Sequence, residues 1–293
     1  MSNIVNTNVG AWTALQNLTA SQRSLGTLQS RINSGLSVSS TKDDSAVYNL
    51  AQSLRGDVGG LAAVGSSLST AKSVVDVAVN GAEAISDILN QMKSTAAKAD
   101  DGTLTDAQRG QYNSDFENLQ KQVDTIVKSA NFNGINLLKD GGGSVSALKS
   151  LYGGSTATTA TTGSAIAWTP DTLAVANVAI DNSGSGLSAI KSSVDLKSQA
   201  NAKSALDKLA DDTVTLGNAL SKLGSAARTI DAQLTFNSKL TDTLNSGIGN
   251  LVDADLAKES ANLQALQVKQ QLGVQALSIA NQAPQTLLSL FRG

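Results

Sequence analysis

The sequence of 293 residues contains no cysteine and no histidine. It therefore has no thiol nucleophile, no disulfide, no histidine-based catalytic triad and none of the common zinc sites. The lack of cysteine fits two settings. One is a reducing compartment, and the other is export of the unfolded chain through a narrow conduit, where cross-links would be a hindrance.

Aromatic residues are almost as scarce, at 3% of the sequence, although hydrophobic residues make up 41%. That hydrophobic content permits a sizeable buried core in one large domain or two ordinary ones. A core of alanine and leucine, with few large rings, is typical of helices packed along narrow seams. The composition therefore favours an elongated helical architecture.

Charge and hydropathy exclude two further classes of protein. The net charge is -2 and the basic residues are scattered, so the chain lacks the basic stripe of a nucleic-acid-binding protein. No segment approaches the roughly 18 to 20 apolar residues that span a bilayer. The N-terminal sequence MSNIVNTNVGAWTALQNL has no basic side chain and no continuous apolar run, so we expect no cleavable signal peptide.

The C-terminal stretch from Leu251 onward carries two apolar rows at helical spacing. The first row consists mostly of small residues: Leu251, Ala254, Ala257, Ala261, Ala265, Val268, Leu272, Ala276, Ile279, Ala283, Leu287 and Leu290. The second row consists of Leu256, Leu263, Leu266, Leu277, Leu288 and Phe291. A helix with two apolar rows needs more than one neighbour. Because a chain end is normally the least ordered part of a domain, we expect other copies of the chain to cover this one.

A first helix is predicted over about residues 10–34, ending at Gly35 in a left-handed conformation. Its apolar stripe also lies at a chain end, so the two terminal helices are expected to pair. The residues assigned to this inner-core packing and to polymerisation are Leu15, Leu18, Leu25, Ile32, Leu256, Leu263, Leu266, Leu272, Leu277, Ile279, Leu287, Leu290 and Phe291.

Two further helices are predicted before the middle of the chain. Thr41 and Asp44 resemble a capping box for a helix that runs to near Ala99, and Thr105 and Gln108 resemble a second one. Four glycines in the first of these helices predict a bend or break, since each costs up to about 1 kcal/mol against alanine. They are Gly56, Gly59, Gly60 and Gly65.

The middle of the chain loses the helical pattern. Asn133 and Gly134 predict a tight hairpin turn. Residues 141–186 are rich in Gly, Ser, Thr and Ala and contain only short alternating fragments, which indicates a short, β-rich or irregular variable surface insert. The threonines in GGSTATTATTGS form either a solvated loop or a site of O-glycosylation. They are Thr156, Thr158, Thr159, Thr161 and Thr162.

The longest seam follows, alternating steps of three and four from Ala202 to Leu251 and running into the terminal stretch. Polar Thr213, Asn237 and Thr241 at seam positions are expected to fix the helix register at some cost in stability. We assign most of this seam to an intramolecular helical bundle. The outer-core seam residues are Leu206, Leu209, Leu216, Leu220, Leu223, Ile230, Leu234 and Leu244.

Together these patterns predict a mainly α fold, an elongated rod of coiled-coil or bundled helices with a small β-hairpin element. Neighbouring carboxylates at Asp43 and Asp44, at Asp100 and Asp101, and at Asp211 and Asp212 do not face one another on a helix. We interpret them as helix starts, loops and solvated faces. No catalytic residue, metal site or cofactor is predicted, so we do not expect an enzyme.

Four segments resemble bacterial flagellins, in the order found in that family. They are NTNVGAWTALQNL, SGLSVSSTKDDSAVYNLA, NFNGINLL and DADLAKESANLQALQVKQQLGVQALSIANQAPQTLLSL. The resemblance implies inner-core helices over residues 1–35 and 251–293. It also implies an outer-core helical bundle over 36–140 and 187–250, with 141–186 as the insert.

The same resemblance implies a structural subunit that polymerises into the extracellular flagellar filament for swimming motility. Its partners would be further copies of itself, the flagellar type III export apparatus and a flagellin chaperone, the filament cap and the hook-filament junction proteins. No nucleic acid or membrane partner is implied. An alternative member of the same group is the hook-filament junction protein, which shares the terminal pattern and assembles only as a short collar.

Overall fold

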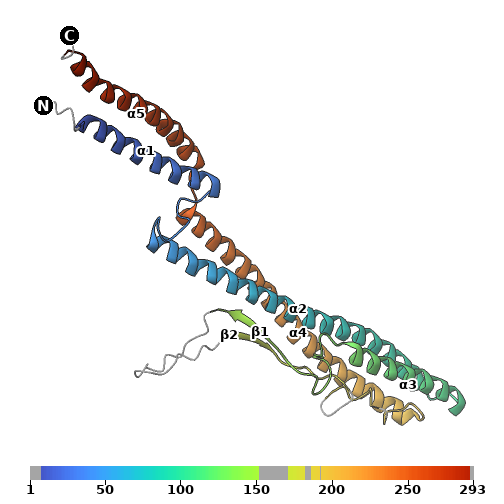
Figure 1. Cartoon of the computed structure of the whole chain (residues 1–293). Coiled ribbons are helices and arrows are strands. Elements are labelled where there is room, and N and C mark those ends of the chain that lie inside the picture. Colours follow the sequence, from blue (N-terminus) through green and yellow to red (C-terminus); the bar gives the residue numbers. More distant parts are fainter. Residues whose placement is uncertain (1–7, 152–170, 182–185, 192, 291–293) are drawn as a thin grey trace, which may run out of the picture. The chain divides into compact units, whose positions relative to one another are not determined.

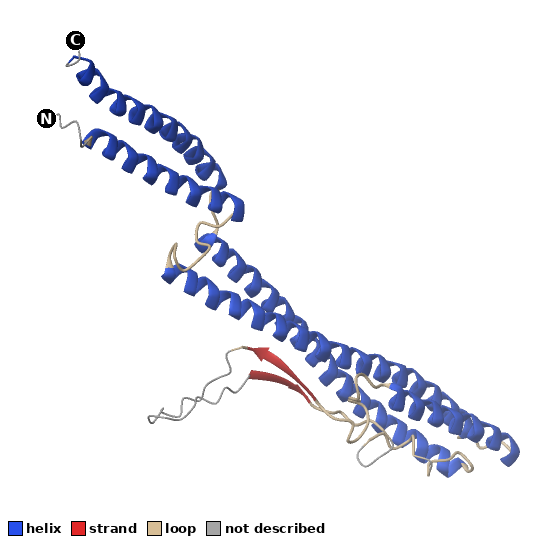
Figure 2. Ribbon diagram, in the orientation of Figure 1, coloured by secondary structure: helices blue, strands red, loops and turns tan. Residues whose placement is uncertain are grey.

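The computed structural model describes residues 8–151, 171–181, 186–191 and 193–290, the last eight of these as backbone only. Within these residues the fold is mainly α, as predicted (Figures 1 and 2). The helices are α1 (Val9–Ser34), α2 (Ser45–Ala99), α3 (Asp106–Ser129), α4 (Gln199–Val252) and α5 (Leu256–Leu290). Strands β1 (Val145–Ser150) and β2 (Asp171–Val175) form an antiparallel pair.

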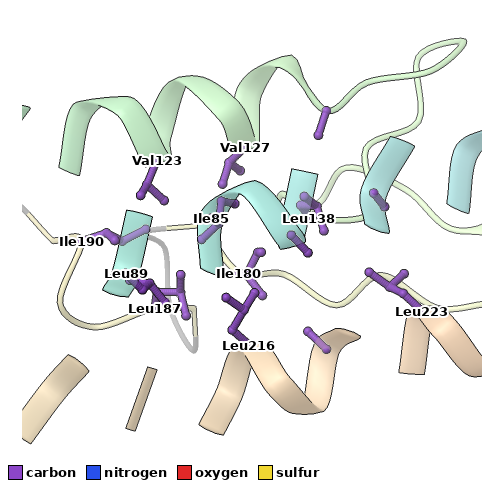
Figure 3. Close-up of a cluster of buried hydrophobic side chains, with 14 of the residues drawn as sticks. Ile85, Leu89, Val123, Val127, Leu138, Ile180, Leu187, Ile190, Leu216 and Leu223 are labelled. Carbon is purple, nitrogen blue, oxygen red and sulfur yellow. The ribbon is translucent and has the colours of Figure 1, made fainter. Parts of the chain in front are cut away.

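The chain divides into two compact units. One comprises Met1–Gly56 with Thr243–Gly293, and the other comprises Asp57–Asp242. The second unit holds the hydrophobic core, which α2, α3 and α4 build together with chain that is not helical (Figure 3). Ile85 of α2, Val123 of α3 and Leu216 of α4 meet in this core.

The non-helical segment that contains residues 187–196 packs against both α3 and α4. Its buried apolar residues are Leu187, Ala189, Ile190, Val194 and Leu196. Buried polar side chains fix its backbone. Asp212 on α4 accepts hydrogen bonds from the Ser188 and Ala189 N–H groups, both at 2.7 Å, and Gln120 on α3 donates to the carbonyls of Ala189 and Val194 at 2.9 and 3.1 Å. Main-chain groups that cannot pair within a helix are thereby satisfied.

The strand pair lies against the helices of the same unit. Val145 pairs with Val175, and both side chains are buried in the core, as is Ala147. Leu148 N–H donates to Ser67 Oγ of α2 at 3.0 Å, and Gln233 of α4 donates to the carbonyl of Lys149 at 2.9 Å. The described ends of the segment 141–186 therefore take part in the core.

The turn predicted at Asn133 and Gly134 is confirmed. Both residues have positive φ, 51° and 84°, and Phe132 pairs with Ile135 across them. Two residues with positive φ define the tight turns that join antiparallel chain segments. The pairing stops at this single bridge, and the chain then turns into the core through Leu137 and Leu138.

Of the bend or break expected in α2, the break is wrong, because one continuous helix runs through all four glycines. Two of them permit close contacts. A Cβ on Gly60 would clash with the side chain of Leu151, and a Cβ on Gly65 would lie 3.0 Å from Nδ2 of Asn237. The glycines thus let other chain segments approach the helix, and packing offsets their weak helix propensity.

Of the two predicted capping boxes, one is confirmed. Thr105 N–H donates to Gln108 Oε1 at 3.0 Å, and Gln108 N–H donates back to Thr105 Oγ1 at 3.4 Å. The box at Thr41 is wrong, since Asp44 itself caps α2 by accepting from the N–H groups of Ala46 and Val47 at 2.9 and 3.0 Å.

Candidate assembly surface

Helices α1 and α5 form an antiparallel pair (Figure 1). Asn8 caps α1 by accepting from Ala11 N–H at 3.0 Å, and its Nδ2 donates to the carbonyl of Ala280 at 2.6 Å. Further along, a Cβ on Gly273 would lie 3.4 Å from Leu18 Cδ1. At the far end of α1, Arg31 Nη1 lies 3.5 Å from Glu259 Oε1. Residues later in α1 thus contact residues earlier in α5, as expected for two antiparallel helices.

Main-chain hydrogen bonds join the end of α1 to the segment where α4 ends and α5 begins. α1 stops at Gly35, whose φ of 71° is left-handed as predicted and whose N–H donates to the Arg31 carbonyl at 2.9 Å. Ser37 N–H then donates to the Val252 carbonyl at 2.7 Å, and Ala254 N–H donates to the Gly35 carbonyl at 2.9 Å.

The helix that carries the long C-terminal seam is interrupted at these main-chain bonds. The sequence predicted that the seam would continue without a break. α4 ends at Val252, and Asp255 starts α5 by accepting from the N–H groups of Ala257 and Lys258 at 3.0 and 3.1 Å. Because of this interruption, the C-terminal segment begins a new helix, α5, which packs against α1.

The α1–α5 contact uses only one side of each helix. On α1, Ser21 and Leu28 are buried, and the half-buried apolar side chains include Leu18, Leu25 and Ile32. On α5, the half-buried apolar side chains include Leu263, Leu266 and Leu277 of the second row. Between 256 and 282, no side chain of α5 is buried. A single partner helix therefore leaves most of α5 uncovered.

α1 does not bury the first row of α5. Its members between 257 and 279 are all exposed: Ala257, Ala261, Ala265, Val268, Leu272, Ala276 and Ile279. The exposed fractions of Leu272 and Ile279 are 60% and 63%. α1 adds exposed Val9, Trp12 and Leu15, at 71%, 75% and 53%. Fully burying one such aliphatic side chain contributes about 1.5–3 kcal/mol, so this surface is suited to association.

The predicted inner-core residues thus divide between two roles. Leu18, Leu25, Ile32, Leu263, Leu266 and Leu277 are half-buried in the pair, whereas Leu15, Leu256, Leu272 and Ile279 are exposed. Leu287, Leu290 and Phe291 are outside the residues whose side chains are described.

The predicted outer-core residues point inward or are half-covered. Leu209, Leu216, Leu223 and Ile230 are buried in the core of the second unit, and Leu206, Leu220 and Leu234 pack against that core. Leu244, in the first unit, is half-buried. The long seam of α4 is thus largely used inside its own chain.

Sequence reasoning missed the ion pair between Arg31 and Glu259. A signal was present, because Arg31 follows buried Leu28 by three residues and Glu259 precedes half-buried Leu263 by four, which places both on the contact sides. In the part of the chain that the structure describes, no cluster of three or more acidic residues could hold a metal ion. None of the described helices is long and apolar enough to cross a membrane.

Comparison with known proteins matches both ends of the chain. Residues 5–142 match the family model for the bacterial flagellin N-terminal helical region, and residues 206–291 match that for the bacterial flagellin C-terminal helical region. Flagellin FljM of Caulobacter vibrioides is 40% identical over 290 residues, which cover 99% of each chain. A flagellin of Brucella melitensis is 33% identical, with 98% of each chain covered. The crystal structure of Bacillus cereus flagellin aligns with 67% of this chain and 93% of that one, at 18% identity and a TM-score of 0.37.

Proposed function

This chain belongs to the bacterial flagellin family, and we propose that it polymerises through the apolar side chains that the α1–α5 pair leaves exposed. It is a structural subunit of the extracellular flagellar filament, which serves swimming motility, and its principal partner is a further copy of itself. The family is a structural one. Nothing here favours the hook-filament junction protein.

The exposed first row of α5 carries the proposal. Seven apolar residues at helical spacing between Ala257 and Ile279 are exposed in the part of the chain that the structure describes. Its alanines allow a neighbouring backbone to approach closely, and its larger residues supply area to bury. Open-ended polymers form when one surface binds a different surface on the next copy without closing a ring.

We divide the chain accordingly. Residues 1–35 and 251–293 form the inner core of the filament, and their apolar rows are completed only by neighbouring subunits. Residues 36–140 and 187–250 form an outer core whose seam is satisfied mainly within the chain, as the buried side chains of Leu209, Leu216 and Leu223 support.

Export is proposed to proceed without a cleaved signal peptide, through the flagellar type III apparatus and with a flagellin chaperone. The absence of cysteine supports this route, because a chain without cross-links can pass a narrow conduit unfolded. The filament cap and the hook-filament junction proteins are proposed as the partners at the two ends of the polymer.

The threonine-rich middle of the insert is proposed to decorate the filament surface without a role in assembly, whereas the described ends of the insert pack in the core. Thr156, Thr158, Thr159, Thr161 and Thr162 lie outside the described residues and are candidates for O-glycosylation. Intact mass spectrometry of protein recovered from the medium tests this, and a mass equal to that of the bare chain would contradict it.

Seeded growth tests the main proposal. Purified monomer added to short sheared filaments is expected to lengthen them to micrometres in electron micrographs. Growth that stops at short collars would assign the chain to the junction class, and monomer that remains soluble would contradict self-polymerisation. Deleting residues 153–162 is expected to leave growth unchanged.

A further inference from the structure

A groove lies on the α1–α5 pair, close to the end of α1. Its volume is about 660 Å³, within the range of roughly 300–1,000 Å³ typical of small-molecule pockets and large enough to admit a side-chain ring. Leu28, Ala265 and Leu266 give it apolar walls. Charged side chains complete the lining, and they are Arg31, Lys258, Glu259 and Lys269.

Positive charge predominates in this groove. The two helices carry four basic residues and one acidic residue, Glu259. Arg31 approaches Glu259 with one nitrogen, Nη1, at 3.5 Å, while its Nε is buried without a hydrogen-bond acceptor among the described residues. A guanidinium carries five N–H donors in one plane and stacks on aromatic rings. Apolar walls combined with such cations favour an aromatic occupant over an aliphatic one.

Trp12 has the chemistry that this groove requires. Its exposed fraction of 75% is the highest among the exposed large hydrophobic side chains in the described part of the chain, and tryptophan offers cations the best ring face of any side chain. It cannot fill the groove of its own chain. Sixteen residues separate Trp12 from Leu28 on one helix, which is about 24 Å at 1.5 Å per residue.

We propose that Trp12 of one copy docks in the groove of a neighbouring copy. The indole ring packs between Leu28 and Leu266, with Arg31 and Lys269 against its face. Because the ring and the groove lie at opposite ends of the same helix pair, the contact joins two different surfaces, as an open-ended polymer requires. This inference rests on the proposed function and names one contact within it.

A double-mutant cycle on the critical concentration for polymerisation tests the contact. Trp12→Ala is expected to raise that concentration on the order of tenfold, as for a buried tryptophan anchor, and Lys269→Ala several-fold. The double variant should be no worse than Trp12→Ala, because Lys269 then has no ring to contact. Arg23→Ala removes a cation that does not line the groove, and its effect should multiply with that of Trp12→Ala.

Cross-linking supplies a second test that does not depend on these energies. The natural chain has no cysteine, so a Trp12→Cys monomer copolymerised with an Ala265→Cys monomer can form a disulfide only between copies. Oxidised filaments are expected to yield covalent dimers. The control pairs Trp12→Cys with Gln264→Cys, an exposed neighbour turned by about 100° around α5, and should yield few.

The outcomes separate this contact from polymerisation itself. If Trp12→Ala and Lys269→Ala multiply, and both cysteine pairs react equally or not at all, the docking of Trp12 is overturned while wild-type filaments still form. If wild-type monomer never polymerises, the proposed function fails first. Circular dichroism of each monomer confirms that the helices are intact.

Discussion

The side-chain amide of Asn237 donates a hydrogen bond of 2.9 Å to the main-chain carbonyl of Leu61, joining α4 to α2 in a mostly apolar seam. Gly65 makes room for it, since a Cβ there would lie 3.0 Å from Nδ2. Oδ1 of Asn237 is buried without a donor among the described residues. A buried polar group that is half satisfied costs stability, and we therefore expect its benefit to be the choice of one register, as for single polar residues in coiled-coil seams.

Gly65→Ala is expected to destabilise the monomer by about 1 kcal/mol. The methyl group displaces Asn237, and loss of a buried hydrogen bond costs about 1–3 kcal/mol, which outweighs a gain of up to about 1 kcal/mol in helix propensity. Gly59→Ala is the matched control, because a Cβ at Gly59 meets nothing within 4 Å. It should stabilise. Urea unfolding followed by circular dichroism measures the stability of both variants, and equal changes would contradict the role of Gly65 in making room for Asn237.

Asp212→Ala is expected to destabilise the second unit by about 2–4 kcal/mol. Its carboxylate accepts from two main-chain N–H groups and from Ser188 Oγ, at 2.7, 2.7 and 2.9 Å, and each buried donor left alone costs about 1–3 kcal/mol. Asp211→Ala removes an exposed carboxylate next to it and should change stability by less than about 0.5 kcal/mol. Thermal unfolding compares the two. Similar losses would mean that Asp212 acts through charge alone.

Asp43 predicts a pH dependence in acid. Hydrogen bonds from the Ser39 hydroxyl and N–H lower the pKa of Asp43 from 3.8, burial opposes them, and hydrogen bonds from the Ser40 hydroxyl and N–H lower it further. Because the folded pKa is the lower one, the stabilisation is complete above the unfolded pKa and is lost as pH falls through the folded pKa. Carboxyl NMR titration should give a midpoint below 3.8 that rises in Ser39→Ala. A midpoint unmoved by that substitution would contradict this origin of the shift.

Sequence patterns predicted the helices well, since α1 begins and ends within a residue of the expected positions, α2 ends at Ala99 and α3 begins directly after Thr105. Apolar spacing missed the stop at Val252, because the apolar steps continue through that point and the interruption depends on main-chain bonds to Gly35 and Ser37. It also missed the core residues around Leu187, whose segment has no period and is fixed by Asp212 and Gln120 from distant helices.

For the assembly surface, spacing revealed two apolar rows on the last helix but not which of them faces α1. That choice depends on three-dimensional contacts such as the one between Leu18 and Gly273. Small residues fit either a close intramolecular contact or a close contact between copies, so composition alone leaves the question open.

Leu272→Asp is expected to abolish filament growth while leaving the monomer folded. Leu272 is 60% exposed in the chain, so a carboxylate there stays in water in the monomer. In a close-packed contact between copies it would be an unpaired buried charge, which costs about 3–5 kcal/mol and raises the critical concentration more than a hundredfold. Gln271→Asp places the same charge one position along the helix, where the exposed side chain lies off the apolar row, and should retain most growth.

Sedimentation of polymer after seeding measures both variants. Normal filaments from Leu272→Asp would remove the first row of α5 from the assembly surface, whereas loss of growth in both variants would indicate a general effect of negative charge on this helix.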